Sequence, residues 1–200
     1  MSFLKREKIS LDKIFRLVGI LLIFCGLSIF IKIYFPIATA EVKYQVSKTK
    51  NTKQEIIPIN TDFSIVIPKI GVNTFVSKNI DPNNPSEYQK ALTRGVAHAK
   101  TSTLPGFSGN VFIFAHSAAD WYQANQYNAI FYLINKLEAG DQIIIYYQNS
   151  KYLYTVSDKK IVNATETNYL SSLSPEQTLT LMTCWPPGTT LNRLIVIAKM

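Results

Sequence analysis

The chain has few of the residues from which disulfides and metal sites are built. Its 200 residues include only two cysteines and two histidines. Cys25 lies in an apolar segment near the N-terminus and Cys184 lies near the C-terminus, so a disulfide between them is not expected. The sequence has no CxxC pair and no cluster with the ligand spacing of structural zinc. We therefore expect a fold without a metal and without a cofactor.

The chain also lacks the concentrated positive charge that nucleic-acid binding requires. The net charge of +8 is unevenly distributed along the sequence. Residues 1–16 carry five basic and two acidic side chains, residues 17–60 carry the same numbers, and residues 61–200 carry eleven basic and nine acidic. Nucleic acid is therefore not an expected partner of the nearly neutral C-terminal part. The excess positive charge lies on both sides of an apolar segment, which indicates that this segment crosses a membrane.

That apolar segment has the length of one membrane span. Residues 17–31 carry no charge, and Ile14 to Phe35 is 22 residues, close to the roughly 20 that cross a bilayer. Arg16 and Lys32 lie near its ends, where their side chains reach the headgroups. Because the short preceding segment is basic, the N-terminus is predicted to be cytoplasmic. This predicts a cytoplasmic tail (1–13), a single-pass anchor in the cell membrane (14–36), a polar linker (37–60) and an extracytoplasmic domain (61–200).

A cleaved signal peptide is the alternative interpretation of the same segment. Residues 38–40 form an A-x-A pattern after a basic region and an apolar core, as in a cleavage site. Both interpretations place residues 41–200 outside the cytoplasm.

The domain is predicted to be mainly β-structure. Segments with an alternating or wholly apolar pattern, separated by turn residues, favour seven or eight short strands. They are residues 63–68, 70–76, 111–115, 142–148, 151–157, 160–164, 178–183 and 194–198. Short helices are expected over 86–94 and within 120–136, and loops over 94–100 and 165–177. Many short strands and few helices are typical of a closed β-barrel around one core.

Cys184 and His116 are the candidate nucleophile and base. An unpaired cysteine in an exported domain suggests reactivity, and a thiol with a pKa of about 8.5 needs a group that takes its proton. His116 directly follows the strand 111–115, whereas no predicted strand holds His98, so His116 is the favoured partner. The alternative is that Cys184 is merely buried and His116 merely hydrogen-bonded, each at a strand end.

Arg193 begins the strand that returns after a Pro-Pro-Gly turn. If this strand pairs antiparallel with the preceding one, Arg193 lies beside Cys184, where a cation would stabilise a developing oxyanion. A solvated arginine at a strand start is the alternative. Asp120 lies four residues after His116 and could orient it, or it is a solvated loop aspartate.

Taken together, these residues resemble the sortase family over roughly residues 62–200. Thr180-Leu-Met-Thr-Cys184 followed by Arg193 is similar to the TLxTC-then-Arg signature of the family. Gly109-Asn110, leading through an apolar strand to His116, is similar to its second block. Lesser similarities are Ile67-Pro-Lys-Ile-Gly71, Pro105-Gly106 and Ala139-Gly-Asp141, and Ala115 stands where many members have glycine.

The resemblance implies an eight-stranded barrel with transpeptidase activity. Sortases cut surface proteins at an LPxTG-like sorting signal through a thioester, and then pass the acyl group to an amine on a cell-wall precursor or a pilin. By resemblance, Cys184 is the nucleophile, His116 the general acid and base, Arg193 the stabiliser of substrate and oxyanion, and Thr183 a further oxyanion donor. Asp81 and Glu87 are too scattered to predict the calcium site of some sortases.

Two other classes of function fit part of these observations. L,D-transpeptidases have a His-Gly-Cys-Arg type of cluster, and NlpC/P60 peptidases have a cysteine before the histidine; neither pattern occurs here. An anchored, non-catalytic β-barrel binding module outside the cytoplasm is the remaining alternative.

Overall fold

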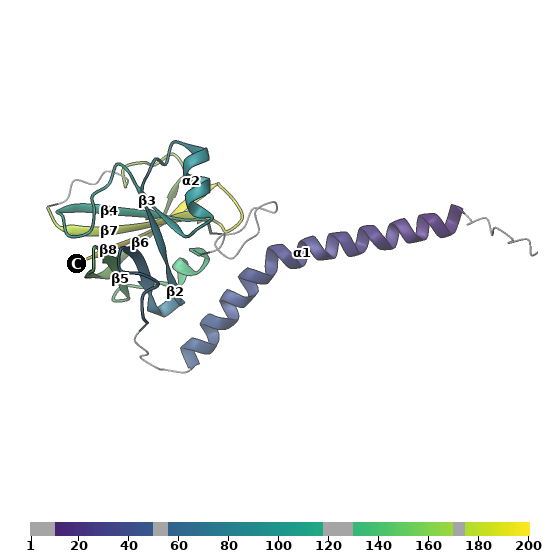
Figure 1. Cartoon of the computed structure of the whole chain (residues 1–200), viewed down its shortest axis with the longest axis horizontal. Helices are drawn as coiled ribbons and strands as arrows, with labels where there is room; N and C mark the ends of the chain where they lie inside the picture. Colours follow the sequence, from purple (N-terminus) through teal and green to yellow (C-terminus); the bar gives the residue numbers. More distant parts are fainter. Residues whose placement is uncertain (1–10, 50–55, 118–129, 170–174) are drawn as a thin grey trace, which may run out of the picture.

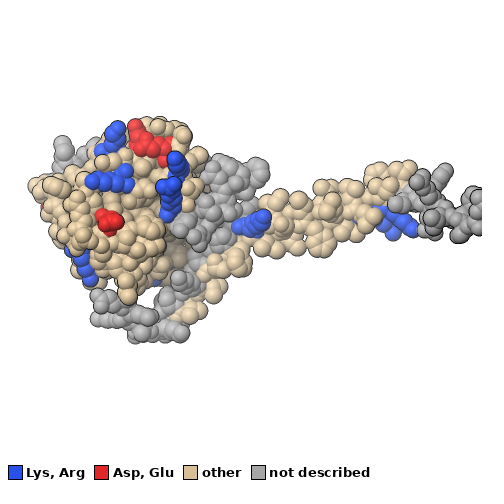
Figure 2. All heavy atoms as spheres, in the orientation of Figure 1, with Lys and Arg blue, Asp and Glu red and all other residues tan. Residues whose placement is uncertain are grey.

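The computed structural model of the chain describes residues 11–49, 56–117, 130–169 and 175–200, and it begins with a long helix. α1 (Leu11–Thr49) extends away from the remainder of the chain (Figure 1). Its Leu11–Lys32 part has a mean hydropathy of 2.6 and is not buried, so it is long and apolar enough to cross a membrane. Figure 2 shows this apolar stretch with basic side chains at both ends.

The C-terminal part of α1 contacts the globular domain. Lys136 Nζ lies 3.3 Å from Glu41 Oε1 and 5.8 Å from the centroid of the Tyr44 ring, and Tyr44 packs against the hydrophobic core. Figure 1 shows this part of the helix running beside the domain. Residues 37–49 of the predicted linker are therefore helical, and at least part of this helix is held by the domain.

Eight strands form a closed barrel, as predicted. Their order is β1-β2-β3-β4-β7-β8-β6-β5, and antiparallel pairing of β1 with β5 closes it. The pairs β2–β3 and β4–β7 are parallel and the others are antiparallel. Closure leaves no exposed sheet edge. The strands are β1 (Phe63–Ile67), β2 (Val72–Ile80), β3 (Val96–Ala99), β4 (Gly109–Phe114), β5 (Gln142–Tyr147), β6 (Ser150–Asn163), β7 (Gln177–Trp185) and β8 (Asn192–Lys199).

Short helices connect some of the strands. α2 (Pro85–Leu92) joins β2 to β3, and its first turn is fixed by Asn84, whose side chain accepts a hydrogen bond from the Glu87 N–H. η1 (Pro68–Ile70) and η2 (Tyr132–Lys136) are single 3-10 turns. The helix expected within 120–136 is thus only the short η2 among the described residues, while residues 118–129 lie outside them.

The barrel interior holds one apolar core. All six residues of β4 are buried, as expected for a strand covered on both faces, while β5 alternates between buried and more exposed residues. Burying one such large side chain contributes about 1.5–3 kcal/mol. The largest fully buried side chains are Tyr154, Phe112, Phe131, Ile65, Ile67, Ile113, Ile134, Leu137, Ile143, Ile145, Leu179 and Leu181.

Two predictions of local structure were wrong. Residues 96–99, predicted as a loop, form β3, because pairing with β2 and β4 stabilises a strand too short to show a pattern of its own. Residues 151–157 and 160–163, predicted to lie in two separate strands (151–157 and 160–164), belong to the single strand β6, and Ala164 lies just after it. The polar, exposed residues near Asp158 resemble a turn in sequence, but they coincide with an irregularity in the β6–β8 register and do not end the strand.

Candidate active site

The three predicted catalytic residues lie at one rim of the barrel. β4 and β7 are parallel, with Phe114 opposite Met182, so His116 and Cys184, each two residues further on, lie at the same end of the two strands. β8 returns antiparallel to β7, with Arg193 directly opposite Cys184. The pairing of these strands therefore brings together residues that are up to 77 positions apart in sequence.

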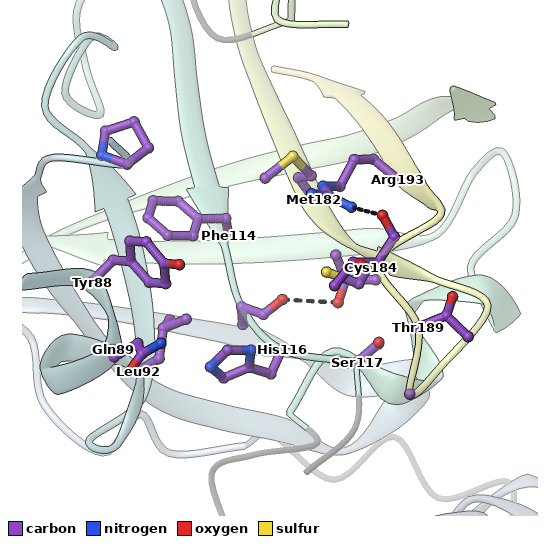
Figure 3. Close-up of a pocket in the computed structure, with 15 residues that line it drawn as sticks. Tyr88, Gln89, Leu92, Phe114, His116, Ser117, Met182, Cys184, Thr189 and Arg193 are labelled. Atoms are coloured by element: carbon purple, nitrogen blue, oxygen red, sulfur yellow. Dashed lines mark hydrogen bonds between the residues drawn. The ribbon is translucent and has the colours of Figure 1, made fainter. Parts of the chain in front are cut away.

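A pocket of about 400 Å³ lies at this rim, and His116, Cys184 and Arg193 all line it. Figure 3 shows Cys184 and Arg193 on one side of the pocket, Tyr88 and Phe114 on the other, and His116 between them. Cys184 is half-buried and is not part of a disulfide. A thiol, an imidazole and a guanidinium in one pocket can supply a nucleophile, a proton carrier and an oxyanion stabiliser.

The backbone before His116 is fastened to the strand that carries Cys184. The Ala115 N–H donates to the Met182 carbonyl at 3.2 Å, and the buried Thr183 hydroxyl donates to the Ala115 carbonyl at 2.8 Å. The His116 carbonyl in turn accepts from the Phe131 N–H at 3.3 Å. These bonds fix the segment from which the His116 ring projects, and they occupy the Thr183 hydroxyl hydrogen.

Arg193 is held at the base of the loop between β7 and β8. Its Nη1 donates to the carbonyl oxygens of Thr190 and Asn192, each at 3.0 Å. Arg193 takes part in none of the five salt bridges found within the described part of the chain. Since a guanidinium has five N–H donors, the side chain is oriented by two carbonyls and its positive charge is not neutralised by a carboxylate there.

His98, the alternative histidine, lies outside this pocket and is completely buried in β3. Its Nδ1 accepts from the Asn79 N–H at 3.3 Å, so the neutral ring carries its proton on Nε2, 2.8 Å from the Thr103 carbonyl. Burial lowers the pKa of His98, against the opposing effect of the hydrogen bond to Thr103. His98 is thus a neutral histidine whose hydrogen bonds support the fold.

Asp81 and Glu87, the two acidic residues considered for a calcium site, do not form one with a third acidic residue among the described residues. Asp81 and Glu87 lie together at the start of α2, where the Asp81 N–H donates to Glu87 Oε1 at 3.3 Å. Across the part of the chain that the structure describes, no three or more His, Cys, Asp or Glu residues are grouped as metal ligands. Asp120 lies outside the described residues.

One wall of the pocket was not predicted from the sequence. Tyr88, Gln89 and Leu92 of α2 line it opposite β7. The sequence indicated a short helix here, but nothing in its pattern showed that this helix packs beside a site formed by residues far along the chain. Only the barrel topology places the two together.

The chain is similar in sequence to known proteins. The sortase domain family model matches residues 65–200. Sortase D of Bacillus subtilis is 25% identical over 136 residues, which are 66% of this chain and 60% of that protein. Sortase A of Listeria monocytogenes is 26% identical over 137 residues, which are 68% of this chain and 55% of that protein. The alignment thus covers 55–60% of the length of these curated relatives.

Solved structures show the same fold. A Clostridium perfringens sortase D5 transpeptidase superposes with a TM-score of 0.57 and 26% identity, over 81% of this chain and 93% of that chain. The family model covers more than half of the sequence, and the closed barrel of the chain agrees with the fold of this solved structure. The chain therefore belongs to the sortase family.

Proposed function

We propose that the chain is a membrane-anchored sortase, a cysteine transpeptidase that acts on an LPxTG-like sorting signal of surface proteins or pilins. The observation that carries the proposal is the single pocket lined by Cys184, His116 and Arg193. The acceptor is an amine on a cell-wall precursor or on a pilin, as the family resemblance implies.

The residues of the pocket suit both halves of such a reaction. His116 takes the Cys184 proton, and the thiolate attacks the scissile carbonyl while Arg193 stabilises the oxyanion. The amide C–N bond then breaks, the leaving amine receives the proton from His116, and a thioester to Cys184 remains. The acceptor amine attacks this thioester and gives its proton to His116. When the new amide has formed, that proton returns to the released Cys184 thiolate.

Thr183 has a supporting role in this proposal. Because its hydroxyl donates to the Ala115 carbonyl, the structure favours a role in holding the His116 segment against β7 over donation by the hydroxyl to the oxyanion. The bond joins the residue before Cys184 to the residue before His116, so it fixes the relative positions of nucleophile and base.

The proposed localisation rests on α1 as a membrane anchor. With residues 14–36 as the anchor and 1–13 in the cytoplasm, the catalytic domain (61–200) lies outside the cytoplasm, where sorting signals and cell-wall amines occur. The helical part of residues 37–60 then lies between the membrane and the barrel.

The test is cleavage of a library of LPxTG-like peptides by the detergent-solubilised full chain, with hydroxylamine as the acceptor amine. Cys184→Ala should abolish formation of the hydroxamate, and Cys25→Ala is the matched control that should leave it unchanged. His116→Ala and Arg193→Ala should each reduce kcat/KM by at least about a hundredfold. Equal turnover by Cys184→Ala and the unaltered chain would contradict the mechanism.

Thiol labelling separates the enzyme from a non-catalytic anchored binding module. With Cys25→Ala as the background, we expect Cys184 to react rapidly and with a pH dependence that His116→Ala or Arg193→Ala alters. Labelling no faster than that of free cysteine, and insensitive to both changes, would favour the binding module.

A further inference from the structure

α2 provides a wall of the pocket that the proposed chemistry does not use. Tyr88, Gln89 and Leu92 line the pocket from this helix, and Phe114 and Met182 line it from the neighbouring strands. Figure 3 shows Tyr88 and Phe114 across the pocket from Cys184. Leu92, Phe114 and Met182 are apolar, so Tyr88 and Gln89 carry the polar side-chain groups among these five residues.

Tyr88 is held in place by its surroundings. Asn84 caps α2, and its carbonyl accepts the hydrogen bond from the Tyr88 N–H at 3.1 Å. The Tyr88 ring meets the Phe114 ring edge to face, with centroids 6.4 Å apart and planes at 74°. A capped helix and a buried aromatic neighbour thus restrict the ring, which orders the hydroxyl before any ligand binds.

The Tyr88 hydroxyl points into the pocket (Figure 3). Among the residues that the structure describes, it has no hydrogen-bond partner. A tyrosine hydroxyl that a ligand shields from water needs a partner, because an unmade hydrogen bond costs free energy there. The ligand that covers this wall must therefore offer a donor or an acceptor to Tyr88.

We propose that Tyr88 is a substrate-binding residue whose hydroxyl forms a hydrogen bond with the backbone of the acyl-donor peptide, while Leu92, Phe114 and Met182 contact its apolar side chains. This inference rests on the proposed function. An extended peptide presents N–H and C=O groups at regular intervals whatever its side chains are, so its backbone is the natural partner of one fixed hydroxyl on an apolar wall.

Tyr88→Phe isolates the hydroxyl, because the ring and its contact with Phe114 remain. With an LPxTG peptide that the full chain cleaves, we expect KM to rise about three- to tenfold with little change in kcat. This is the effect of losing a contact that binds the substrate and the transition state equally well. The thermal unfolding temperature and the rate of Cys184 alkylation by iodoacetamide should not change. Tyr146→Phe, a half-buried tyrosine of β5 outside the pocket, is the matched control and should have unaltered KM.

Backbone-modified peptides identify the bond itself. Replacing the peptide's amides one at a time by esters, except the scissile amide, should weaken cleavage by the unaltered chain wherever the amide is hydrogen-bonded. At one position, part of that loss should be absent with Tyr88→Phe. Such non-additivity at a single position is the sign of a direct contact. The same loss in both proteins at every position, or an unchanged KM for Tyr88→Phe, would overturn the role of Tyr88.

The outcomes distinguish this inference from the proposed function. If the unaltered chain cleaves the peptide and Tyr88→Phe cleaves it equally well, only the role of Tyr88 fails. If the unaltered chain cleaves no LPxTG-like peptide, the proposed function fails and the role of Tyr88 fails with it.

Discussion

The two histidines show how the environment of one residue decides what it can do. His98 is completely buried, and both of its ring nitrogens lie within hydrogen-bonding distance of partners in its own part of the barrel. His116 is half-buried and lines the pocket beside Cys184. The same side chain therefore supports the fold at one position and lines the candidate site at the other.

The lowered pKa of His98 predicts a loss of stability in weak acid. Above about pH 6.5, the ordinary pKa of histidine, His98 is neutral in both the folded and the unfolded chain, so stability is full. Below it, the unfolded chain binds a proton that the folded chain resists, and the free energy of unfolding falls until the pH reaches the lowered folded pKa. Urea unfolding at about pH 7.5 and 5.5 should show a larger loss for the unaltered chain than for His98→Gln.

His98→Gln is informative because glutamine does not titrate in this range but can still donate and accept hydrogen bonds. The carboxylates titrate alike in both proteins, so the comparison isolates His98. Equal losses of unfolding free energy in the two proteins would contradict a lowered pKa for His98.

At the scale of elements, the buried side chain of Asn110 links β4 to β7 by hydrogen bonds. Asn110 Oδ1 accepts hydrogen bonds from the hydroxyls of Thr178 at 3.2 Å and Thr180 at 2.9 Å. Its Nδ2 donates to the Tyr169 carbonyl at 2.9 Å. The parallel pair that places His116 beside Cys184 is thus fixed by a side chain at its far end as well as by the ladder between the strands.

Asn110→Leu should destabilise the barrel by about 2–3 kcal/mol, because it leaves the buried Thr180 hydroxyl and the Tyr169 carbonyl without their partner at about 1–3 kcal/mol each. Urea unfolding measures the loss. Asn73→Leu is the matched control: its side chain bonds to Ile57 and Ile59 at an exposed position, so we expect a loss below about 1 kcal/mol. Equal losses of unfolding free energy in the two variants would argue against a stabilising role for the Asn110 hydrogen bonds.

Whether an element could be predicted depended on how strongly its own residues are patterned. β4 and β7 were predicted because a wholly apolar run and an alternation of threonine with apolar residues indicate strands by themselves. β3 was missed because its four residues are strand-like only through their partners in β2 and β4. The site residues at the ends of β4 and β7 were predictable, whereas Tyr88 was not, since α2 lies elsewhere in the sequence.

At the scale of the whole molecule, α1 and the barrel are joined by a small contact. Glu41 and Lys136 form an ion pair in which each side chain is about one third exposed, and Lys136 also lies over the Tyr44 ring. Lys136 belongs to η2, which is linked to the site because Phe131, just before η2, bonds to the His116 carbonyl. The contact thus connects the proposed anchor to the part of the barrel that carries the pocket.

Breaking this contact should loosen the C-terminal part of α1. An exposed ion pair and a cation–π contact together contribute about 1 kcal/mol, so Glu41→Lys should speed amide hydrogen exchange in residues 41–49 about fivefold, measured in lipid nanodiscs. The double variant Glu41→Lys with Lys136→Glu restores the ion pair in reverse but not the cation–π contact, so it should slow the exchange again in part. Lys160→Glu, which breaks an ion pair on β6, is the control and should leave this exchange unchanged.

Exchange in residues 41–49 that stays the same after Glu41→Lys would show that the helix is not held by this contact. Exchange that rises with Glu41→Lys but does not recover in the double variant would assign the effect to Glu41 alone.

The sequence by itself determined the properties that depend on local pattern. These are the apolar segment between basic residues, most of the barrel-forming strands, and the order of His116, Cys184 and Arg193 at strand ends. Each depends on neighbouring residues along the chain, so periodicity, charge and motif spacing reveal it.

Only the tertiary structure decided which distant residues meet. Pairing of β4 with β7 and of β7 with β8 brought the three residues into one pocket, placed α2 with Tyr88 opposite them, and buried His98 away from them. It also directed the Thr183 hydroxyl to Ala115 and joined α1 to η2. These contacts depend on how strands and helices far apart in sequence pack around one core, and local pattern carries no information about that packing.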